Sequence, residues 1–261
     1  MKITGKDFKK VKDFEKEKDK FYLLLKIARS ENSLIYSDLK NYIIGRGDIG
    51  YPTWIWTKDT ISLEKFLELK EVLEKYLTKE DTKFTCKKEL YNLLEKEYKT
   101  SNYFEMGYLS CEKTIKPLKE TGVIRRPKSY EKVTLAEFWR DNCKEIDNKE
   151  ITQREALEEV EGWLESNRFF VLENNGEIVS MAGFGIENNL AKITHVYTPK
   201  EERRKSYCKN LIYNLSKKLI EKGYKPVLYT NYNYKASNKA YEGVGFVNKG
   251  ILINFTIKND N

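Results

Sequence analysis

A short charged loop between an expected strand and an expected helix contains three basic residues in a row. The segment VYTPKEERRKSYCKNL (196–211) carries Arg203, Arg204 and Lys205, and the helical spacing begins at Ser206. Free N–H groups and the positive end of the helix dipole attract anions at the start of a helix. The three cations add to that attraction. The spacing therefore predicts a site for a phosphate or pyrophosphate group.

A second group of polar residues follows after one further expected helix and strand. The segment LYTNYNYKASNKAYEGVGF (228–246) contains the pattern N-x-x-x-S-N-x-x-Y-x-x-x-G-F, whose members are Asn233, Ser237, Asn238, Tyr241, Gly245 and Phe246. A tyrosine at this place could donate a proton to a leaving group. The alternatives are a packed aromatic for Tyr241, in a chain with 18 tyrosines, and helix-start hydrogen bonds for Ser237 and Asn238.

The two segments together resemble the paired motifs of the GNAT acyltransferase superfamily. The first motif has a polar or basic residue, two variable positions, glycine, any residue, and then glycine or alanine. Arg203 takes the first place, Ser206 stands where the first glycine is usual, and Cys208 stands at the final small position. Many relatives also carry glycine at the place of Arg204, because backbone must approach phosphate closely there. The second motif matches almost without interruption from Ser237 to Phe246.

The resemblance implies acetyl-CoA as cosubstrate and an amine-bearing acceptor. Backbone N–H groups of Val196 and Thr198, in the strand segment that includes Tyr197, would bind the pantetheine arm and orient the carbonyl. The loop and first turn, 203–208, would bind the pyrophosphate with Arg203, Arg204, Lys205, Ser206, Tyr207 and Cys208. Asn233 and Asn238 would contact the cofactor arm. Tyr241 would be the catalytic residue that donates a proton or a hydrogen bond to the departing thiolate.

The sequence does not identify a general base. Some relatives use a glutamate on the strand before the loop, but the strand AKITHVYT (191–198) has none. His195 is the single histidine and has a suitable ordinary pKa. Strand alternation, however, places it on the face opposite Thr194 and Val196, which favours a structural role. Water could relay the proton, or the amine could arrive neutral.

Two functions are therefore weighed for the chain. The first is an N-acetyltransferase that transfers the acetyl group of acetyl-CoA to a primary amine by direct attack. The second is a catalytically weak or inactive GNAT-like module that binds acyl-CoA as a sensor or scaffold. The acceptor is not predicted, since variable segments build the acceptor sites of the family.

Composition limits the remaining function classes. The formal net charge is +8, but lysines alternate with glutamates along expected helices, as is typical of solvated faces. We therefore do not expect a nucleic-acid partner. The four cysteines are far apart and have no C-x-x-C pair, which argues against zinc or a disulfide framework and fits a reducing cytoplasm. No apolar run is long enough for a membrane span and no secretory signal is apparent. A monomer or homodimer is expected.

The expected elements predict an α/β (α+β) fold. Expected helices cover about 7–29, 37–44, 62–77, 88–98, 152–167, 206–221 and 236–242, and expected strands cover about 51–57, 83–86, 103–109, 168–173, 177–185, 191–198, 226–230 and 251–257. Thr152 and Glu155 form a capping-box pattern, and Asn175-Gly176 suits a hairpin turn. Helices, hairpins and strand–helix–strand units in this order pack as a mixed, mainly antiparallel sheet flanked by helices.

The expected domains are an α/β N-terminal lobe (1–117), a linker (118–125) with proline and glycine nearby, and a GNAT acetyl-CoA-binding acetyltransferase domain (126–261). The N-terminal lobe shows no chemical motif. Its order of elements is compatible with a smaller, degenerate GNAT-like lobe that lacks cofactor residues, which would make a two-lobed, pseudo-tandem protein of the bacterial type. The order of elements is what supports this lobe.

Overall fold

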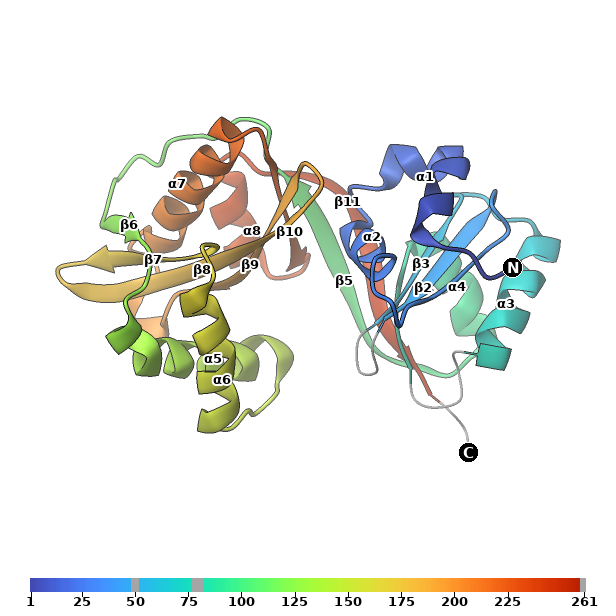
Figure 1. Ribbon diagram of the computed structural model, residues 1–261, viewed down its shortest axis with the longest axis horizontal. Coiled ribbons are helices and arrows are strands. Elements are labelled where there is room, and N and C mark those ends of the chain that lie inside the picture. Colours follow the sequence, from blue (N-terminus) through green and yellow to red (C-terminus); the bar gives the residue numbers. More distant parts are fainter. Residues whose placement is uncertain (48–51, 77–81, 259–261) are drawn as a thin grey trace. The chain divides into compact units, whose positions relative to one another are not determined.

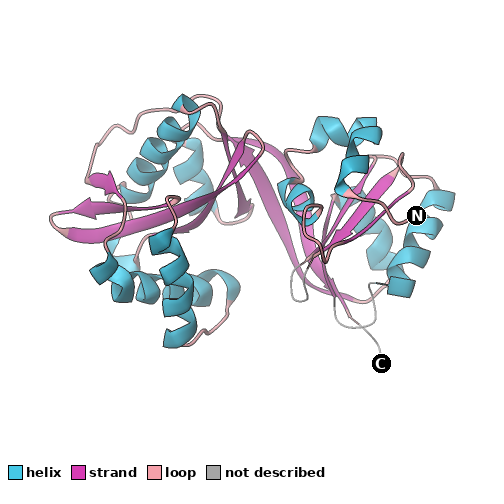
Figure 2. Cartoon of the chain, in the orientation of Figure 1, coloured by secondary structure: helices cyan, strands magenta, loops and turns pink. Residues whose placement is uncertain are grey.

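The computed structural model describes residues 1–47, 52–76 and 82–258, and it divides the chain into two compact units. Unit 1 comprises Met1–Tyr108, Tyr229–Tyr234 and Asn248–Asn261, and unit 2 comprises Leu109–Leu228 and Lys235–Val247. Figure 1 labels the elements of both units, and Figure 2 separates helices from strands. These units are groups of residues in contact, and each combines segments that are distant in the sequence. The domain boundaries expected from the sequence, 1–117 and 126–261, stay a prediction.

The first half of the chain supplies two helical segments after a short 3-10 turn, then three strands, and then a helix–strand–helix–strand run. In order, these elements are η1 (Gly5–Lys10), α1 (Lys12–Glu17), α2 (Tyr22–Ile27), β1 (Leu34–Ser37), β2 (Tyr42–Arg46), β3 (Thr53–Thr57), α3 (Leu63–Tyr76), β4 (Thr82–Cys86), α4 (Lys88–Glu97) and β5 (Thr100–Ser110).

The second half repeats this order, with an added strand before its two helices. Its elements are β6 (Val123–Arg125), η2 (Ser129–Glu131), α5 (Lys132–Asp147), α6 (Gln153–Glu165), β7 (Phe169–Asn174), β8 (Glu177–Glu187), β9 (Leu190–Tyr197), η3 (Lys200–Glu202), α7 (Tyr207–Glu221), β10 (Lys225–Asn231), α8 (Lys235–Glu242) and β11 (Val247–Ile257). The strand β6 occupies the end of the segment expected as a linker and pairs with β7.

The strand pairing repeats as well. In unit 1, β1, β2 and β3 pair antiparallel, β3 and β4 pair parallel, and β11 joins β4 antiparallel. In unit 2, β7, β8 and β9 pair antiparallel, and β9 and β10 pair parallel. In both cases a helix, α3 or α7, connects the parallel pair, as a parallel connection requires. The predicted fold class, a mixed and mainly antiparallel sheet flanked by helices, is confirmed.

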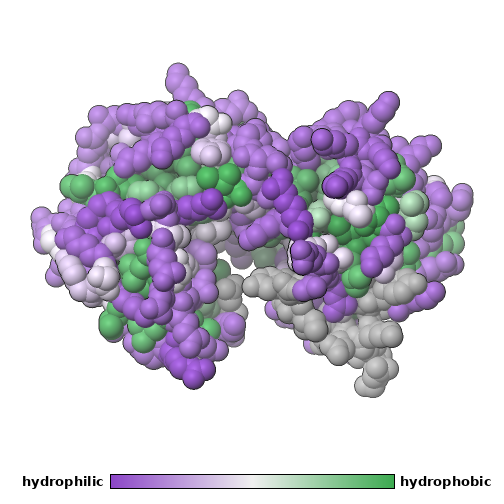
Figure 3. Space-filling view, in the orientation of Figure 1, coloured by the Kyte–Doolittle hydropathy of each residue, from purple (hydrophilic) through white to green (hydrophobic). Residues whose placement is uncertain are grey.

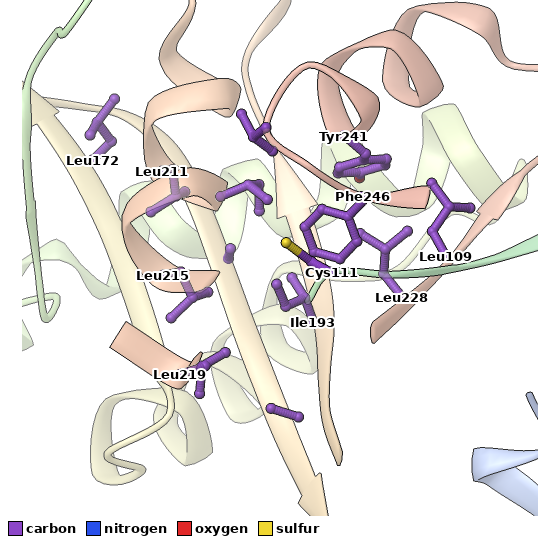
Figure 4. Packing of buried hydrophobic residues seen from close by; sticks show 14 of the residues in the cluster. Leu109, Cys111, Leu172, Ile193, Leu211, Leu215, Leu219, Leu228, Tyr241 and Phe246 are labelled. Atoms are coloured by element: carbon purple, nitrogen blue, oxygen red, sulfur yellow. The ribbon is translucent and has the colours of Figure 1, made fainter. Parts of the chain in front are cut away.

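Helices cover both faces of the sheet in unit 2. Figure 1 shows α5 and α6 on one side of β7–β9 and α7 on the other. On the α7 side, Leu211, Leu215 and Leu219 belong to one apolar cluster that also contains Ile193 of β9. In Figure 4 these leucines project from α7 toward the strands. The second cluster, on the α5 and α6 side, includes Trp163. Burial on two faces fixes the position of β9 in the middle of the unit.

Two expected helices are wrong. The segment expected as one helix over 7–29 consists of η1, α1 and α2, with breaks at Val11 (φ −92°, ψ 83°) and Phe21 (φ −106°, ψ 36°). Both residues are buried in the same core cluster, so the breaks let successive apolar side chains reach one core. Helical spacing alone does not show such breaks.

The segment 37–44 is not a helix but the end of β1, the hairpin turn and the start of β2. Asp38 Oδ1 accepts the backbone N–H groups of Asn41 and Tyr42 at 2.7 and 3.2 Å, and Leu39 has φ +62°. Side-chain bonds of this kind compete with helical hydrogen bonds. The β-branched residues that follow then pair as β2, with Ile43 opposite Ser37. The expected strand 51–57 is confirmed as β3 where it is described, and Tyr51 and Leu77 lie outside the described residues.

Local signals in the second half are confirmed. Thr152 Oγ1 accepts the N–H of Glu155 at 3.2 Å, and the Glu155 carboxylate accepts the N–H of Thr152 at 2.7 Å, which completes the capping box. Asn175 and Gly176 have φ values of +53° and +87°, as their hairpin turn requires. In the described part of the chain, no helix is long and apolar enough to cross a membrane. Hydrophilic residues dominate the visible face in Figure 3.

Candidate acyl-CoA site

The strand β9 contains a bulge near its end. Its register with β8 pairs Gly183 with Thr194 and then Met181 with Tyr197, so that β9 contains one more residue than β8 in this interval. His195 lies in the bulge with φ +53°, a conformation that is uncommon outside glycine and that histidine, asparagine and aspartate adopt more often than other residues. A bulge bends a strand and leaves backbone groups outside the ladder. The predicted pantetheine-binding backbone, Val196–Thr198, is therefore at a place where β9 departs from regular pairing.

The same strand leaves its other neighbour early. The parallel pairing of β9 with β10 joins Leu190–Lys192 to Lys225–Val227, and β9 continues beyond it to Tyr197. Among the described residues, the end of β9 is thus not paired with β10. Val196 and Thr198 thus lie beyond the β10 ladder, as their predicted role requires.

The carbonyl groups at the end of β9 accept hydrogen bonds from side chains of neighbouring elements. The amide of Asn142 on α5 donates to Val196 O at 3.4 Å. The Ser180 hydroxyl donates to Tyr197 O at 3.0 Å and lies 2.9 Å from the Thr198 hydroxyl. These contacts fix the bulge without using the N–H groups that the sequence analysis assigned to the ligand.

The loop before α7 contains two residues in the left-handed region. Arg204 has φ +64° and Ser206 has φ +70°, although neither is glycine. Ser206 is the N-cap of α7, and in the part of the chain that the structure describes its side chain makes no cap hydrogen bond. The first intrahelical bond is from Asn210 N–H to Ser206 O. The N–H groups of Tyr207 and Cys208 therefore belong to the orphan donors of a helix start.

The three cations of this loop have different surroundings. Arg203 is paired with Glu145 of α5 through two short hydrogen bonds of 2.6 and 2.7 Å. Lys205 lies 3.1 Å from Glu202, and the side chain of Arg204 is exposed. The loop fits an anionic ligand through the start of α7 and Arg204, while two of its cations have carboxylate partners.

The first turn of α7 is fixed by buried polar contacts. Asn210 is buried, and its amide donates to Ser206 O, to Lys119 O and to the Thr121 hydroxyl at 2.9, 2.9 and 3.1 Å. The hydroxyl of Tyr207 accepts from Asn174 of β7 at 3.0 Å. These contacts hold the helix start in one orientation relative to the sheet of unit 2.

Tyr241 of α8 packs in the same core as the start of α7. It is 8% exposed, its ring centroid lies 6.1 Å from that of Phe246, and Tyr207 belongs to the same cluster. Figure 4 shows Tyr241 and Phe246 together with Leu228 and Cys111. Burial, with a smaller contribution from Cys208, raises the pKa of Tyr241 well above its usual range. The hydroxyl is therefore protonated at neutral pH and can donate a hydrogen bond.

Gly245 explains the glycine of the second motif. It has φ +104°, and a Cβ at this position would lie 2.3 Å from Lys113 O. The N–H groups of Val244 and Phe246 both donate to Tyr241 O at 3.1 Å. The tight turn that Gly245 permits therefore connects α8 to β11 and places Phe246 beside Tyr241.

The two asparagines of the second motif fall in different units. Asn238 is part of α8 in unit 2 and is half-buried. Asn233 lies in the turn before α8, is exposed, and belongs to unit 1 with the segment Tyr229–Tyr234. Its N–H donates to Asn231 Oδ1 at 3.0 Å. Their predicted contacts with the cofactor arm stay predictions.

His195 lies among aromatic rings. The ring centroids of Trp139, Trp163 and Phe169 are 4.9, 4.9 and 6.4 Å away. Burial, with a smaller contribution from Lys192, lowers the pKa of His195 to about 4. The imidazole is therefore neutral near pH 7, and the half-buried side chain packs among these rings. Among the described residues, no cluster of histidine, cysteine and carboxylate side chains could hold a metal ion.

Sequence reasoning missed the contribution of α5. This helix supplies Asn142 and Glu145, which contact Val196 and Arg203. The apolar residues Leu135, Trp139 and Cys143 recur at four-residue spacing, so the helix itself was detectable. Its polar residues gave no signal of their partners, which lie more than fifty positions later in the sequence.

The comparisons with known proteins agree with this geometry. Residues 135–246 match the model of the acetyltransferase (GNAT) family. That range contains the β9 bulge, the loop before α7, and α8. This match identifies the segment 135–246 as a GNAT acetyltransferase segment. Members of this family typically use acetyl-CoA. No curated protein matches the chain.

Solved GNAT structures share the fold over nearly the whole chain. A GNAT-family acetyltransferase from Colwellia psychrerythraea has a TM-score of 0.60 at 13% identity, with 95% of this chain and 97% of that chain covered. A GCN5-related N-acetyltransferase from Kribbella flavida has a TM-score of 0.62 at 11% identity, with 92% and 95% covered. One from Sphaerobacter thermophilus has a TM-score of 0.60 at 11% identity, with 92% and 88% covered. At these identities the likeness concerns the fold alone.

Proposed function

We propose that this GNAT protein is an N-acetyltransferase that transfers the acetyl group of acetyl-CoA to a primary amine by direct attack. The observation that supports it most is the concentration of strained backbone at the predicted site. His195, Arg204 and Ser206 all have positive φ, and they lie in the bulge of β9 and the loop before α7. Strain of this kind persists where function requires a particular backbone shape.

In this proposal the N–H groups at the start of α7 bind the pyrophosphate. The residues concerned are Arg204, Lys205, Ser206, Tyr207 and Cys208, with Arg204 and Lys205 adding positive charge. The cofactor arm runs along Val196, Tyr197 and Thr198, where the bulge frees backbone donors. Asn238 of α8 contributes a polar contact to the same arm.

Tyr241 acts as the acid. The amine nitrogen attacks the acetyl carbonyl, the carbon–sulfur bond breaks, and the departing thiolate takes the Tyr241 proton, which the proton lost by the amine replaces through water. The amine must lose a proton to a base. No glutamate lies on β9, and His195 is enclosed by aromatic rings, so water is the proposed relay. The acceptor amine stays unassigned.

The second candidate is an acyl-CoA-binding module with weak or no turnover. It is favoured by the same absence of a carboxylate on β9 and by the aromatic packing of His195. It predicts cofactor binding without amine-dependent release of the CoA thiol.

Two measurements test these proposals. Acetyl-CoA at about 100 times its dissociation constant should stabilise the protein by about 2.7 kcal/mol, which a thermal melt detects. If millimolar acetyl-CoA gives no shift, both candidates are wrong. On an amine that the wild type accepts, Tyr241→Phe should then lower kcat about ten- to a hundred-fold with near-normal acetyl-CoA affinity.

The matched control is Tyr213→Phe, because Tyr213 of α7 packs against the same core cluster. This variant should keep wild-type turnover. Equal turnover in wild type and Tyr241→Phe would remove Tyr241 from the acid role. Thiol release that no amine stimulates in the wild type would favour the binding module.

The N-terminal half is proposed to be a degenerate GNAT-like lobe. Its support is the repeated order of two helical segments, three antiparallel strands, a helix, a parallel strand, a helix and a strand. It lacks the loop of cations that precedes α7. Titration calorimetry should accordingly give one acetyl-CoA per chain, whereas two equivalents would mean that this half also binds.

A further inference from the structure

Arg203 makes three directed hydrogen bonds. Its Nη1 and Nη2 donate to the two carboxylate oxygens of Glu145 at 2.6 and 2.7 Å, and its Nε donates to Thr198 O at 2.9 Å. The guanidinium carbon also lies 5.8 Å from the ring centroid of Tyr197. The planar, bidentate arrangement is the strongest geometry available to an arginine–carboxylate pair.

These bonds connect three separate elements of unit 2. Glu145 lies near the end of α5, Thr198 directly follows β9, and Arg203 follows η3. The two side chains are 26% and 30% exposed, respectively, for Glu145 and Arg203. The Arg203 guanidinium holds the pKa of the Glu145 carboxyl below its usual value. The pair therefore stays charged at neutral pH.

The backbone that follows Arg203 is strained. Arg204 and Ser206 lie just after it in the left-handed region, a conformation that costs free energy for a residue that is not glycine. The Arg203 bonds fix the loop on its N-terminal side, and the Asn210 amide, which donates to Ser206 O at 2.9 Å, fixes it on the C-terminal side. The strained turn thus lies between two fixed points.

We propose that Glu145 and Arg203 are a positioning pair that shapes the loop 198–206 for the pyrophosphate. This proposal rests on the proposed acetyl-CoA function. It assigns Arg203 a different role from the one that its place in the motif implied, because its guanidinium binds a carboxylate and a carbonyl of its own chain. Phosphate binding then depends on backbone N–H groups whose direction the pair sets, and Glu145 affects the ligand only through Arg203.

Glu145→Gln distinguishes the two roles of Arg203. If the pair positions the loop, the variant should bind acetyl-CoA about ten-fold more weakly, since a charge-assisted bond is lost. If Arg203 is instead a phosphate ligand, removal of its neutralising partner should leave affinity equal or raise it. Titration calorimetry measures the difference, and equal or tighter binding would overturn the proposal.

Glu202→Gln is the matched control. Like Glu145→Gln, it removes one negative charge near Arg203, but Glu202 forms an i,i+3 pair with Lys205 at 3.1 Å and not a bidentate pair with an arginine. Long-range attraction of the ligand changes similarly in both variants, so this control should stay within about two-fold of wild type. An equal loss in the two variants would contradict a specific role for Glu145.

Arg203→Lys is the second variant. Lysine keeps the charge but cannot form the bidentate bond together with the bond to Thr198 O. It should therefore bind acetyl-CoA as weakly as Glu145→Gln, whereas wild-type affinity would favour a simple cation role. S-acetylpantetheine, which lacks the pyrophosphate, should bind wild type and both variants equally. A parallel loss for this ligand would indicate general damage to the fold and would contradict the proposal.

Amide hydrogen exchange without ligand separates this inference from the proposed function. Exchange in residues 198–207 should be faster in Glu145→Gln than in wild type or Glu202→Gln. Unchanged exchange would reject the positioning pair even if acetyl-CoA binds. Faster exchange in a protein that does not bind acetyl-CoA would reject the proposed function and leave the pair established.

Discussion

Lys87 Nζ lies 2.6 Å from Asp59 Oδ1, and this ion pair connects the residue after β4 with the loop after β3. The same ammonium also pairs with Glu17 of α1 and lies 5.5 Å from the ring centroid of Trp56. The last parallel pair in unit 1 is Ile55–Cys86, and the last in unit 2 is Lys192–Val227. Lys87 and Leu228 thus take equivalent places in the two halves of the chain, one residue beyond the last parallel pair.

Lys87→Met should destabilise the protein by about 1–3 kcal/mol. The Lys87 side chain is only 5% exposed, and its removal leaves Glu17 without this buried cation. Breaking a fully buried pair costs about 3–5 kcal/mol, and the exposure of Asp59 reduces that value. Urea denaturation measures the change. Lys18→Met is the control, since its pair with Glu15 is more exposed, and an equal loss in both variants would contradict the special place of Lys87.

Ser206→Gly should stabilise the protein by about 0.5–1 kcal/mol, because glycine accepts the left-handed conformation at φ +70° without steric cost. Ser206→Ala should be nearly neutral, since it keeps the strain and Ser206 makes no cap bond in the described structure. Both should keep acetyl-CoA binding in a thermal melt with ligand. A loss above about 1 kcal/mol in the alanine variant would show that the hydroxyl caps α7.

His195 should make stability fall as the pH drops from 6.5 to 5. The folded pKa is lowered to about 4, and an unfolded histidine titrates near 6.5. Below pH 6.5 the unfolded chain binds a proton that the folded chain does not, so unfolding becomes easier. The loss by pH 5 should be about 1–2 kcal/mol, and stability should be fully present above pH 6.5.

His195→Asn tests this prediction, because asparagine tolerates positive φ and His195 is the only histidine. The variant loses aromatic contacts and starts less stable, but its stability should change little between pH 6.5 and 5. Urea midpoints at several pH values give both slopes. A variant slope equal to that of wild type would assign the effect to other groups.

Sequence signals succeeded where the deciding contacts are local. The Thr152–Glu155 capping box and the Asn175-Gly176 turn depend on residues within three positions of one another. The strand–loop–helix around Arg203 followed from the same kind of pattern. The prediction of a helix at 37–44 was wrong because the Asp38 side chain accepts hydrogen bonds from backbone N–H groups, which hydrophobic periodicity does not reveal.

Contacts between segments that are distant in the chain could not be predicted from a single sequence. Glu145 is 58 positions from Arg203. Nothing in the sequence of the loop indicated that the Arg203 guanidinium would pair with a carboxylate of α5. The positive φ of Ser206 and Arg204 was equally hidden, because their residue types do not favour it. The repeated topology of the two halves has no visible repeat in the sequence, since packing constrains element order more strongly than residue identity.

Gly245→Ala should destabilise unit 2 by about 2–4 kcal/mol and weaken the placement of Tyr241. The added Cβ would lie 2.3 Å from Lys113 O at a φ of +104°, and neither the backbone contact nor the strain can be relieved without moving the turn. Gly162→Ala in α6 is the matched control, because a Cβ there meets nothing within 4 Å. That variant should gain about 0.5–1 kcal/mol from helix propensity.

Since Phe246 N–H donates to Tyr241 O, Gly245→Ala should also lower turnover on any accepted amine. A stable Gly245→Ala protein with wild-type turnover would show that this turn does not position the tyrosine.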